Sequence, residues 1–95
     1  MANVLARVEL HGADEEAYET LHEHMQSMGF VRKIPHGDGT YNKLPDATYI
    51  ASKKGDLMPL RDKISSYANK LGTRNASVFL CEFDECAWYL FRADD

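Results

Sequence analysis

The strongest constraint on the fold is the strict alternation of apolar residues between Val4 and Leu10. Every second residue of this stretch is apolar: Val4, Ala6, Val8 and Leu10. One side of an extended chain is then entirely hydrophobic, as in a strand whose face packs on a core. The stretch therefore predicts a β-strand, and Gly12 is expected to end it.

Two segments place apolar residues at helical spacing and are expected to form amphipathic helices. The first covers residues 14–28 and begins at Asp14, the expected N-cap. The second covers residues 57–71 and begins after Asp56, the second expected N-cap. The outer face of the first helix is acidic because it carries Glu15, Glu16, Glu19 and Glu23.

Further strands are expected at Phe30–Ile34, Ala47–Lys53 and Asn75–Phe83, with an extra strand at Cys86–Arg92. The order β-α-β-β-α-β predicts an α+β, ferredoxin-like split βαβ fold with two helices on one face of an antiparallel sheet. A chain of 95 residues is long enough for one domain and too short for two. Residues 1–95 are therefore expected to form a single ferredoxin-like domain.

The strand expected at residues 75–83 is apolar on both faces, although two helices can cover only one face of a sheet. The uncovered residues would form an apolar patch, which usually marks an interface. We therefore expect a homodimer, joined through the open sheet face or through the last strand. The alternative is a monomer whose last strand folds over its own edge. The expected interface residues are Phe79, Cys81, Phe83, Trp88, Tyr89 and Phe91.

The two cysteines, Cys81 and Cys86, are five residues apart, which is the spacing of neither a CxxC redox motif nor a zinc-binding pair. The start of the chain has no signal-peptide pattern, and no run of apolar residues is long enough to span a membrane. We expect reduced thiols in a cytoplasmic protein, with no membrane contact and with no metal or other cofactor.

The formal net charge of −4 conceals an uneven distribution along the chain. Residues 1–31 carry one basic and six acidic side chains, whereas residues 32–54 carry five basic and two acidic ones. The acidic total argues against a generally cationic nucleic-acid binder, and double-stranded DNA is not expected as a partner. The basic middle segment is the first indication of function.

Tyrosines are interleaved with the cations of this basic segment. Cations bind phosphates and aromatic rings stack on unpaired bases, a combination typical of single-stranded RNA recognition. In the alternative interpretation these charges only solvate a sheet edge and deter aggregation. The candidate RNA-binding residues are Arg32, Lys33, Tyr41, Lys43, Tyr49, Lys53 and Lys54.

Three runs of sequence carry a resemblance to a known family: Val4-Leu-Ala-Arg-Val-Glu-Leu-His-Gly12, Gly29-Phe-Val-Arg-Lys-Ile34 and Leu44-Pro-Asp-Ala-Thr-Tyr49. With this length and element order, the chain resembles small bacterial proteins related to GhoS, the antitoxin of the type V toxin–antitoxin system. That family has a ferredoxin-like fold similar to the CRISPR-associated Cas2 proteins and acts as an endoribonuclease on its toxin's mRNA. The resemblance implies an antitoxin-like RNA-binding protein, with mRNA cleavage as an expected activity to test.

The end of the first expected strand departs from the pattern of metal-dependent Cas2-type nucleases, which carry an aspartate there. This sequence has Glu9-Leu10-His11-Gly12 instead, so any cleavage is expected to be metal-independent. Such cleavage needs a base, an acid and cations on the phosphate. Histidine can serve as base or acid near neutral pH, and a guanidinium can bind a phosphate through two hydrogen bonds.

The catalytic candidates are therefore His11, His36 and Arg32. His11 follows the first expected strand and His36 follows the second, and the sequence leaves open whether they meet, within one chain or across a dimer. The alternative for each is an ordinary, solvated loop histidine. His22 and His24 are expected to be ordinary residues of the first helix.

A second class of function is a non-enzymatic protein-interaction module or inhibitor. The acidic helix at residues 14–28 could bind a basic partner or imitate nucleic acid, and the exposed sheet face could bind a protein.

Overall fold

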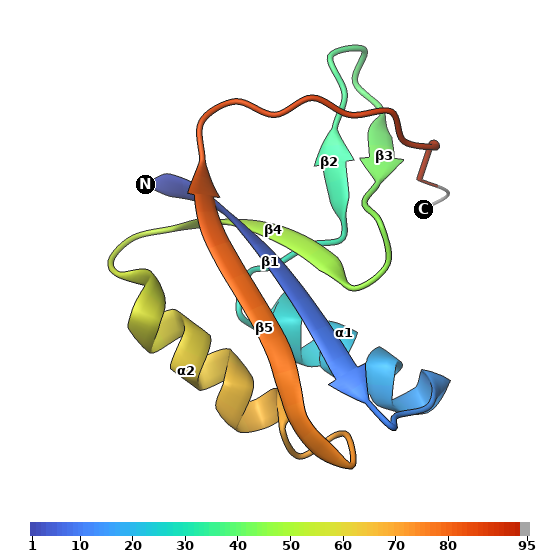
Figure 1. The fold of residues 1–95 in the computed structure, drawn as a ribbon. Helices are drawn as coiled ribbons and strands as arrows, with labels where there is room; N and C mark the ends of the chain where they lie inside the picture. The colour runs from blue at the N-terminus through green and yellow to red at the C-terminus, as the bar shows by residue number, and fades with distance from the viewer. Residues whose placement is uncertain (94–95) are drawn as a thin grey trace.

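The structure, a computed structural model, describes residues 1–93 of the chain. Its elements in chain order are β1 (Ala2–His11), α1 (Glu15–Ser27), β2 (Lys33–Pro35), β3 (Tyr41–Lys43), β4 (Thr48–Lys53), α2 (Leu57–Ala68) and β5 (Arg74–Phe83) (Figure 1). Two helices and antiparallel strands confirm the expected α+β class.

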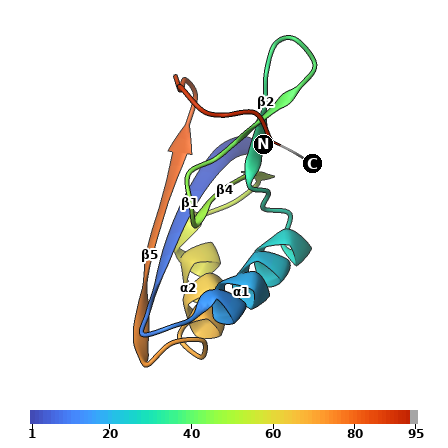
Figure 2. The ribbon, with the colours of Figure 1, turned by 90° about the vertical axis from the view of Figure 1, so that its right-hand side faces the viewer.

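The main sheet has three strands in the order β4-β1-β5, and β1 pairs antiparallel with both of its neighbours. Both helices lie on the same side of this sheet, so its other face is open (Figure 2). The predicted alternation of β1 is confirmed, because Val4, Ala6, Val8 and Leu10 are all buried.

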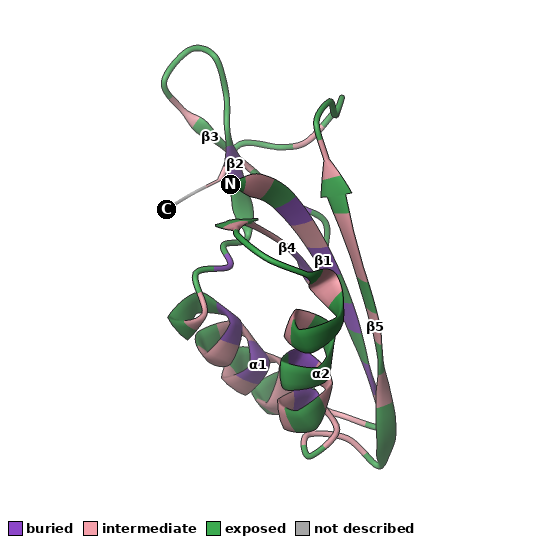
Figure 3. Cartoon of the chain, turned by 90° about the vertical axis from the view of Figure 1, so that its left-hand side faces the viewer, coloured by how far each residue is buried: buried purple, intermediate pink, exposed green. Residues whose placement is uncertain are grey.

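The core fills the space between the sheet and the two helices, where the buried parts of β1, α1 and α2 face one another (Figure 3). Its apolar residues come from both layers, as period-2 strands and amphipathic helices require. The buried cluster consists of Val4, Ala6, Val8, Leu10, Leu21, Met25, Phe30, Tyr49, Ile64 and Ala68.

Helix α1 begins and ends as its sequence predicts. The carboxylate of Asp14 accepts a hydrogen bond from the backbone N–H of Ala17 at 2.9 Å, which confirms the predicted N-cap. Gly29 follows the helix with a φ of 91°, a conformation that glycine adopts without strain. Asp56 precedes α2, but its side chain makes no capping hydrogen bond.

The strand expected at Phe30–Ile34 does not become the fourth strand of the main sheet. Only Val31 reaches β4, through reciprocal 2.9 Å backbone hydrogen bonds with Ile50. The chain then leaves the edge of β4, and β2 pairs with β3 as a separate two-stranded hairpin. Pro35, which has no N–H, ends β2 after three residues. The fold is thus not a clean ferredoxin-like split βαβ sheet.

The strand expected at Cys86–Arg92 is absent from the described structure. The chain bends at Asp84, and residues 84–93, here called the tail, cross from the end of β5 to the hairpin (Figure 1). Within the tail only Arg92 forms an isolated bridge, with Asn42 of β3. The aromatic residues of this segment therefore lie beside the hairpin and not along β5.

The open face of the main sheet exposes Phe79, which is 62% accessible, while Cys81 and Phe83 are half-buried. Leu5 and Ile50 lie on the same face of β1 and β4 and are also half-buried. No helix within residues 1–93 has the length and apolar character needed to cross a membrane.

Candidate nucleic-acid interface

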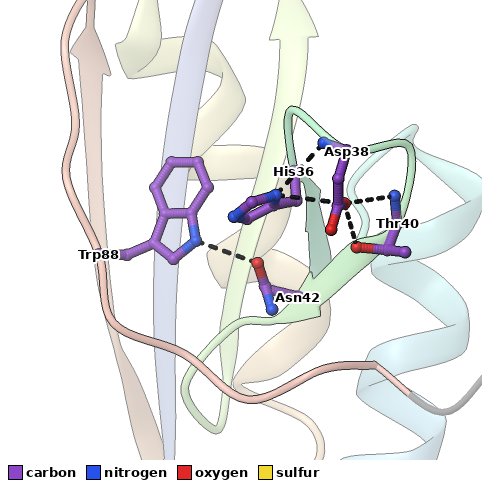
Figure 4. Close-up of polar contacts among 5 residues, drawn as sticks. All are labelled: His36, Asp38, Thr40, Asn42 and Trp88. Carbon is purple, nitrogen blue, oxygen red and sulfur yellow. Dashed lines mark hydrogen bonds and ion pairs between the residues drawn. The ribbon is translucent and has the colours of Figure 1, made fainter.

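The β2–β3 hairpin is closed by a turn at residues 36–40 whose groups hydrogen-bond to one another (Figure 4). The backbone N–H of His36 donates to the carbonyl of Thr40 at 2.8 Å. The Asp38 carboxylate accepts from the Thr40 backbone N–H and hydroxyl, at 3.0 and 2.5 Å. These hydrogen bonds lower the pKa of Asp38 to about 2. His36 belongs to this turn, since its Nδ1 accepts from the Asp38 backbone N–H at 3.3 Å.

One face of the hairpin carries two lysines and a tyrosine, all exposed. Lys33 and Lys43 lie directly opposite each other in the β2–β3 register, so they share this face. Tyr41 shares it too, because it precedes Lys43 by two residues, and the Lys33 ammonium lies 4.8 Å from its ring centre. Like charges placed directly opposite destabilise a strand pair. Such a local conflict is typical of a functional surface, here one suited to anions.

The tail adds exposed aromatic rings to the same face. The backbone N–H of Lys43 donates to the carbonyl of Phe91, and that of Ala93 to the carbonyl of Tyr41, both at 2.9 Å. Opposite residues in an antiparallel pair share a face, so Phe91 lies beside Lys43. Phe91 is 76% exposed and Tyr89 is 87% exposed, and their rings meet edge to face with centres 5.8 Å apart. We call Lys33, Tyr41, Lys43, Tyr89 and Phe91 the hairpin–tail surface.

Trp88 links the tail to the other face of the hairpin through a hydrogen bond. Its Nε1 donates to the side-chain oxygen of Asn42 at 3.3 Å (Figure 4). Asn42 alternates with Tyr41 and Lys43 along β3 and therefore points away from the lysine face. The bond from Trp88 thus helps to hold the neighbouring Tyr89 in place while leaving the hairpin–tail surface open.

A groove of about 480 Å³ continues from the hairpin–tail surface to α1. Its hairpin side is lined by Arg32, Lys33 and Lys43, and its α1 side by Glu19 and His22, among others. The α1 side thus carries carboxylates, and Asp46, which follows β3, adds another carboxylate to the lining. A phosphate is favoured near Arg32, Lys33 and Lys43, away from these carboxylates.

His22, on the α1 side of this groove, is held by a hydrogen bond between its Nδ1 and the hydroxyl of Tyr49, at 2.7 Å. Burial raises the pKa of Tyr49, so its hydroxyl keeps its proton at neutral pH. Burial, and then the nearby charge of Arg32, lower the pKa of His22. The two residues therefore form a neutral pair that joins α1 to β4. The sequence predicts only an ordinary helix residue for His22 and gives no sign of this link between the groove and the core.

Stability is expected to fall as the pH is lowered below about 6.5, the unperturbed pKa of histidine. His24 stacks on Tyr67 with ring centres 3.6 Å apart, its Nε2 is buried without a partner, and burial lowers its pKa as it does that of His22. The unfolded chain then binds protons that the folded chain does not, so acid favours unfolding. Thermal midpoints from pH 8 to pH 5 test this, and His22→Gln and His24→Gln should each flatten the decline. A midpoint independent of pH would contradict it.

Two predicted RNA-binding residues are used inside the fold instead. Tyr49 is fully buried in the core and has no ring surface left for a base. The Lys53 ammonium donates to the Met28 carbonyl at the end of α1 and lies 5.5 Å from the ring centre of Phe30. Lys54 is exposed at the end of β4, near the start of α2, and does not contribute to the hairpin–tail surface.

Lys53→Met is expected to lower the free energy of unfolding by about 1 kcal/mol, because the C-terminal carbonyls of α1 lose a cationic partner. Urea denaturation measures the loss. Lys54→Met is the matched control and should leave stability unchanged. Neither substitution should alter RNA affinity, and weaker RNA binding by Lys53→Met at unchanged stability would contradict this internal role.

His11 lies at the far end of the molecule from the hairpin, where β1 ends (Figure 1). Its Nε2 is 3.0 Å from the Ser77 hydroxyl, and its Nδ1 is 3.5 Å from the Arg74 guanidinium. These neighbours belong to β5. Within one chain His11 and His36 therefore do not meet, and the three catalytic candidates, which include Arg32 beside the groove, do not form one site.

Within residues 1–93, no three His, Cys, Asp or Glu side chains gather in an arrangement that could hold a metal ion. No protein-family model, curated protein or solved structure matches this chain.

Proposed function

We propose that this protein binds single-stranded RNA through the hairpin–tail surface. The observation that carries the proposal is the cross-strand pair of exposed lysines, Lys33 and Lys43, with the exposed rings of Tyr89 and Phe91 beside it. Ammonium groups bind phosphates, and flat rings stack on bases. Bases are free to stack on a protein only when they are unpaired, so a single strand fits this surface better than a duplex.

The resemblance to the GhoS-related antitoxins supports the same class of ligand. β1 lies between β4 and β5 as in a ferredoxin-like sheet, with the fourth strand reduced to the bridge at Val31. We therefore propose an antitoxin-like regulator that binds mRNA in the bacterial cytoplasm. Binding is the core of the proposal. Cleavage by one chain would need His36 and Arg32 to act with a group other than His11.

Fluorescence anisotropy with a labelled single-stranded RNA tests the proposal. The logarithm of the binding constant should fall linearly with the logarithm of salt concentration, by about 0.7 per phosphate contacted. Lys33→Gln/Lys43→Gln should weaken binding and make this slope shallower by about 1.4. The matched control is Lys63→Gln/Lys70→Gln, which removes two exposed lysines of α2 and its C-terminal end. Unchanged binding by the hairpin variant, or equal loss in both variants, would contradict the proposal.

A basic protein partner is the second candidate, supported by the acidic face of α1. Glu15, Glu16, Glu19 and Glu23 are exposed, and none of them forms an ion pair with another described residue. Absence of RNA binding, together with binding to polylysine that Glu16→Lys/Glu19→Lys abolishes, would favour this second function.

A further inference from the structure

Strand β5 forms one edge of the main sheet, and the outer side of its backbone faces no other described strand. The N–H of Val8 donates to the carbonyl of Ala47 at 3.1 Å, which directs the backbone groups of Val8 away from β5. Val8 lies opposite Val78. In an antiparallel pair the hydrogen-bonding direction alternates along each strand, so the N–H and C=O of Val78 also point away from β1. The same alternation directs the backbone N–H and C=O groups of Leu80 and Glu82 away from β1. We call this outer side of β5 the free edge.

This free edge is limited at both ends. Near the start of β5 the register is irregular, and the N–H of Ala76 already donates to the side chain of Asn69 at 2.8 Å. At the other end the chain bends at Asp84. The unpaired backbone therefore extends over residues 77–83, and Leu80 is at its centre.

The free edge lacks the devices that normally prevent strands from pairing. Residues 77–83 contain no proline and no lysine, and Glu82 carries their only charge. Phe79 is 62% exposed on the open face next to the edge. Flat apolar edges of this kind pair with another strand unless they are blocked.

We propose that two copies of this chain pair through the β5 edge, antiparallel, with a two-fold axis at Leu80. Side chains on the open face alternate in size along β5: Ser77, Phe79, Cys81 and Phe83. The axis at Leu80 places each phenylalanine opposite a small residue, Phe79 opposite Cys81 and Phe83 opposite Ser77. Moving the axis by one residue, to Phe79 or to Cys81, keeps the same backbone groups facing the partner. These registers place Phe79 opposite Phe79 or opposite Phe83, so two phenylalanines meet.

Charge supports a second copy as the occupant of this edge. With the axis at Leu80, each Glu82 lies opposite Val78 of the other copy, so the two carboxylates stand at opposite ends of the interface. An isologous interface requires such self-complementarity. The two sheets would join into one continuous sheet through hydrogen bonds from Val78, Leu80 and Glu82. The hairpin–tail surface takes no part, so the inference does not depend on RNA binding.

Disulfide trapping tests the register. In the proposed dimer Phe79 and Cys81 form a non-hydrogen-bonded pair with Cα atoms about 4.5 Å apart, within disulfide range. Phe79→Cys in a Cys86→Ser background should therefore give a covalent dimer under mild oxidation, seen on a non-reducing gel. Ser77→Cys in the same background is the matched control and should stay monomeric on the gel, because Ser77 then faces Phe83. Cross-linking of the control but not of Phe79→Cys would overturn the register.

Sedimentation velocity tests the pairing itself. The wild-type chain should sediment as a dimer, and Glu82→Pro should halve the mass at an unchanged circular dichroism spectrum. Proline at this position removes an outward N–H and leaves the hydrogen bonds to β1 in place. A monomeric wild-type protein, or a Glu82→Pro variant that remains dimeric, would overturn the proposal.

Discussion

Replacing Tyr89 and Phe91 together with alanine is expected to weaken single-stranded RNA binding by about 10²-fold, since each stacked ring contributes about 1–3 kcal/mol. Both side chains are among the most exposed of the large apolar residues, and they contact each other more than the core. The double variant should therefore keep the stability of the wild-type protein. Anisotropy titration gives the affinity, and thermal denaturation gives the stability.

Phe79→Ala is the matched control, because Phe79 is also an exposed aromatic residue but lies on the open sheet face. RNA affinity should be unchanged in this variant. An equal loss of affinity in Phe79→Ala would indicate nonspecific aromatic binding, and no loss in the double variant would exclude the tail from the RNA site.

Tyr49→Ala is expected to lower the free energy of unfolding by about 3–5 kcal/mol, because it empties a fully buried position between β4 and α1. That is a large part of the stability of a small domain. Tyr49→Phe keeps the ring and removes only the hydrogen bond to His22, so its cost should be about 1 kcal/mol. Urea denaturation of both variants measures the difference.

RNA affinity separates the structural role of Tyr49 from the role in RNA binding expected from the sequence. Tyr49→Phe keeps the fold and should bind RNA as tightly as the wild-type protein, since the ring does not reach the hairpin–tail surface. A selective loss of RNA affinity in Tyr49→Phe would show that the Tyr49–His22 pair shapes the groove.

The elements with long periodic patterns were predictable from the sequence. β1 alternates over its whole length, and α1 combines helical spacing with an N-cap at Asp14 and a stop at Gly29. These signals are local, because they depend on the geometry of one element against any apolar surface. The pairing partners are not local, and that is where the expected sheet differs from the observed one.

Short apolar runs do not specify which strand they join. Residues 30–34 and 86–92 both contain apolar residues at extended spacing, yet neither becomes a strand of the main sheet. The turn at residues 36–40 brings β2 to β3, and the bend at Asp84 carries the tail to the same hairpin. Each of these choices depends on a competition between distant segments that periodicity does not describe.

The candidate site, like the fold, was predictable only where the signal is local in the sequence. The sequence places Lys33, Tyr41 and Lys43 in one basic segment, but it predicts no strand at Tyr41–Lys43. The pairing of this unexpected strand with β2 brings the three side chains to one face. The internal use of Lys53 at the end of α1 does not, because it depends on how α1 and β4 meet in space. The sequence predicts that Trp88, Tyr89 and Phe91 lie in a dimer interface. The structure places them beside the hairpin instead, where the tail pairs with β3.

The central position of β1 has a kinetic consequence. Its two neighbours lie far away along the chain, since Val4 pairs with Ala51 on one side and with Glu82 on the other. Chains whose native contacts are mostly distant in sequence fold slowly, because long loops must close before those contacts form. The helices can form early, but the first strand stays without one neighbour until the last strand reaches it. We therefore expect folding on the millisecond-to-second scale, with the pairing of β5 with β1 as the rate-limiting step.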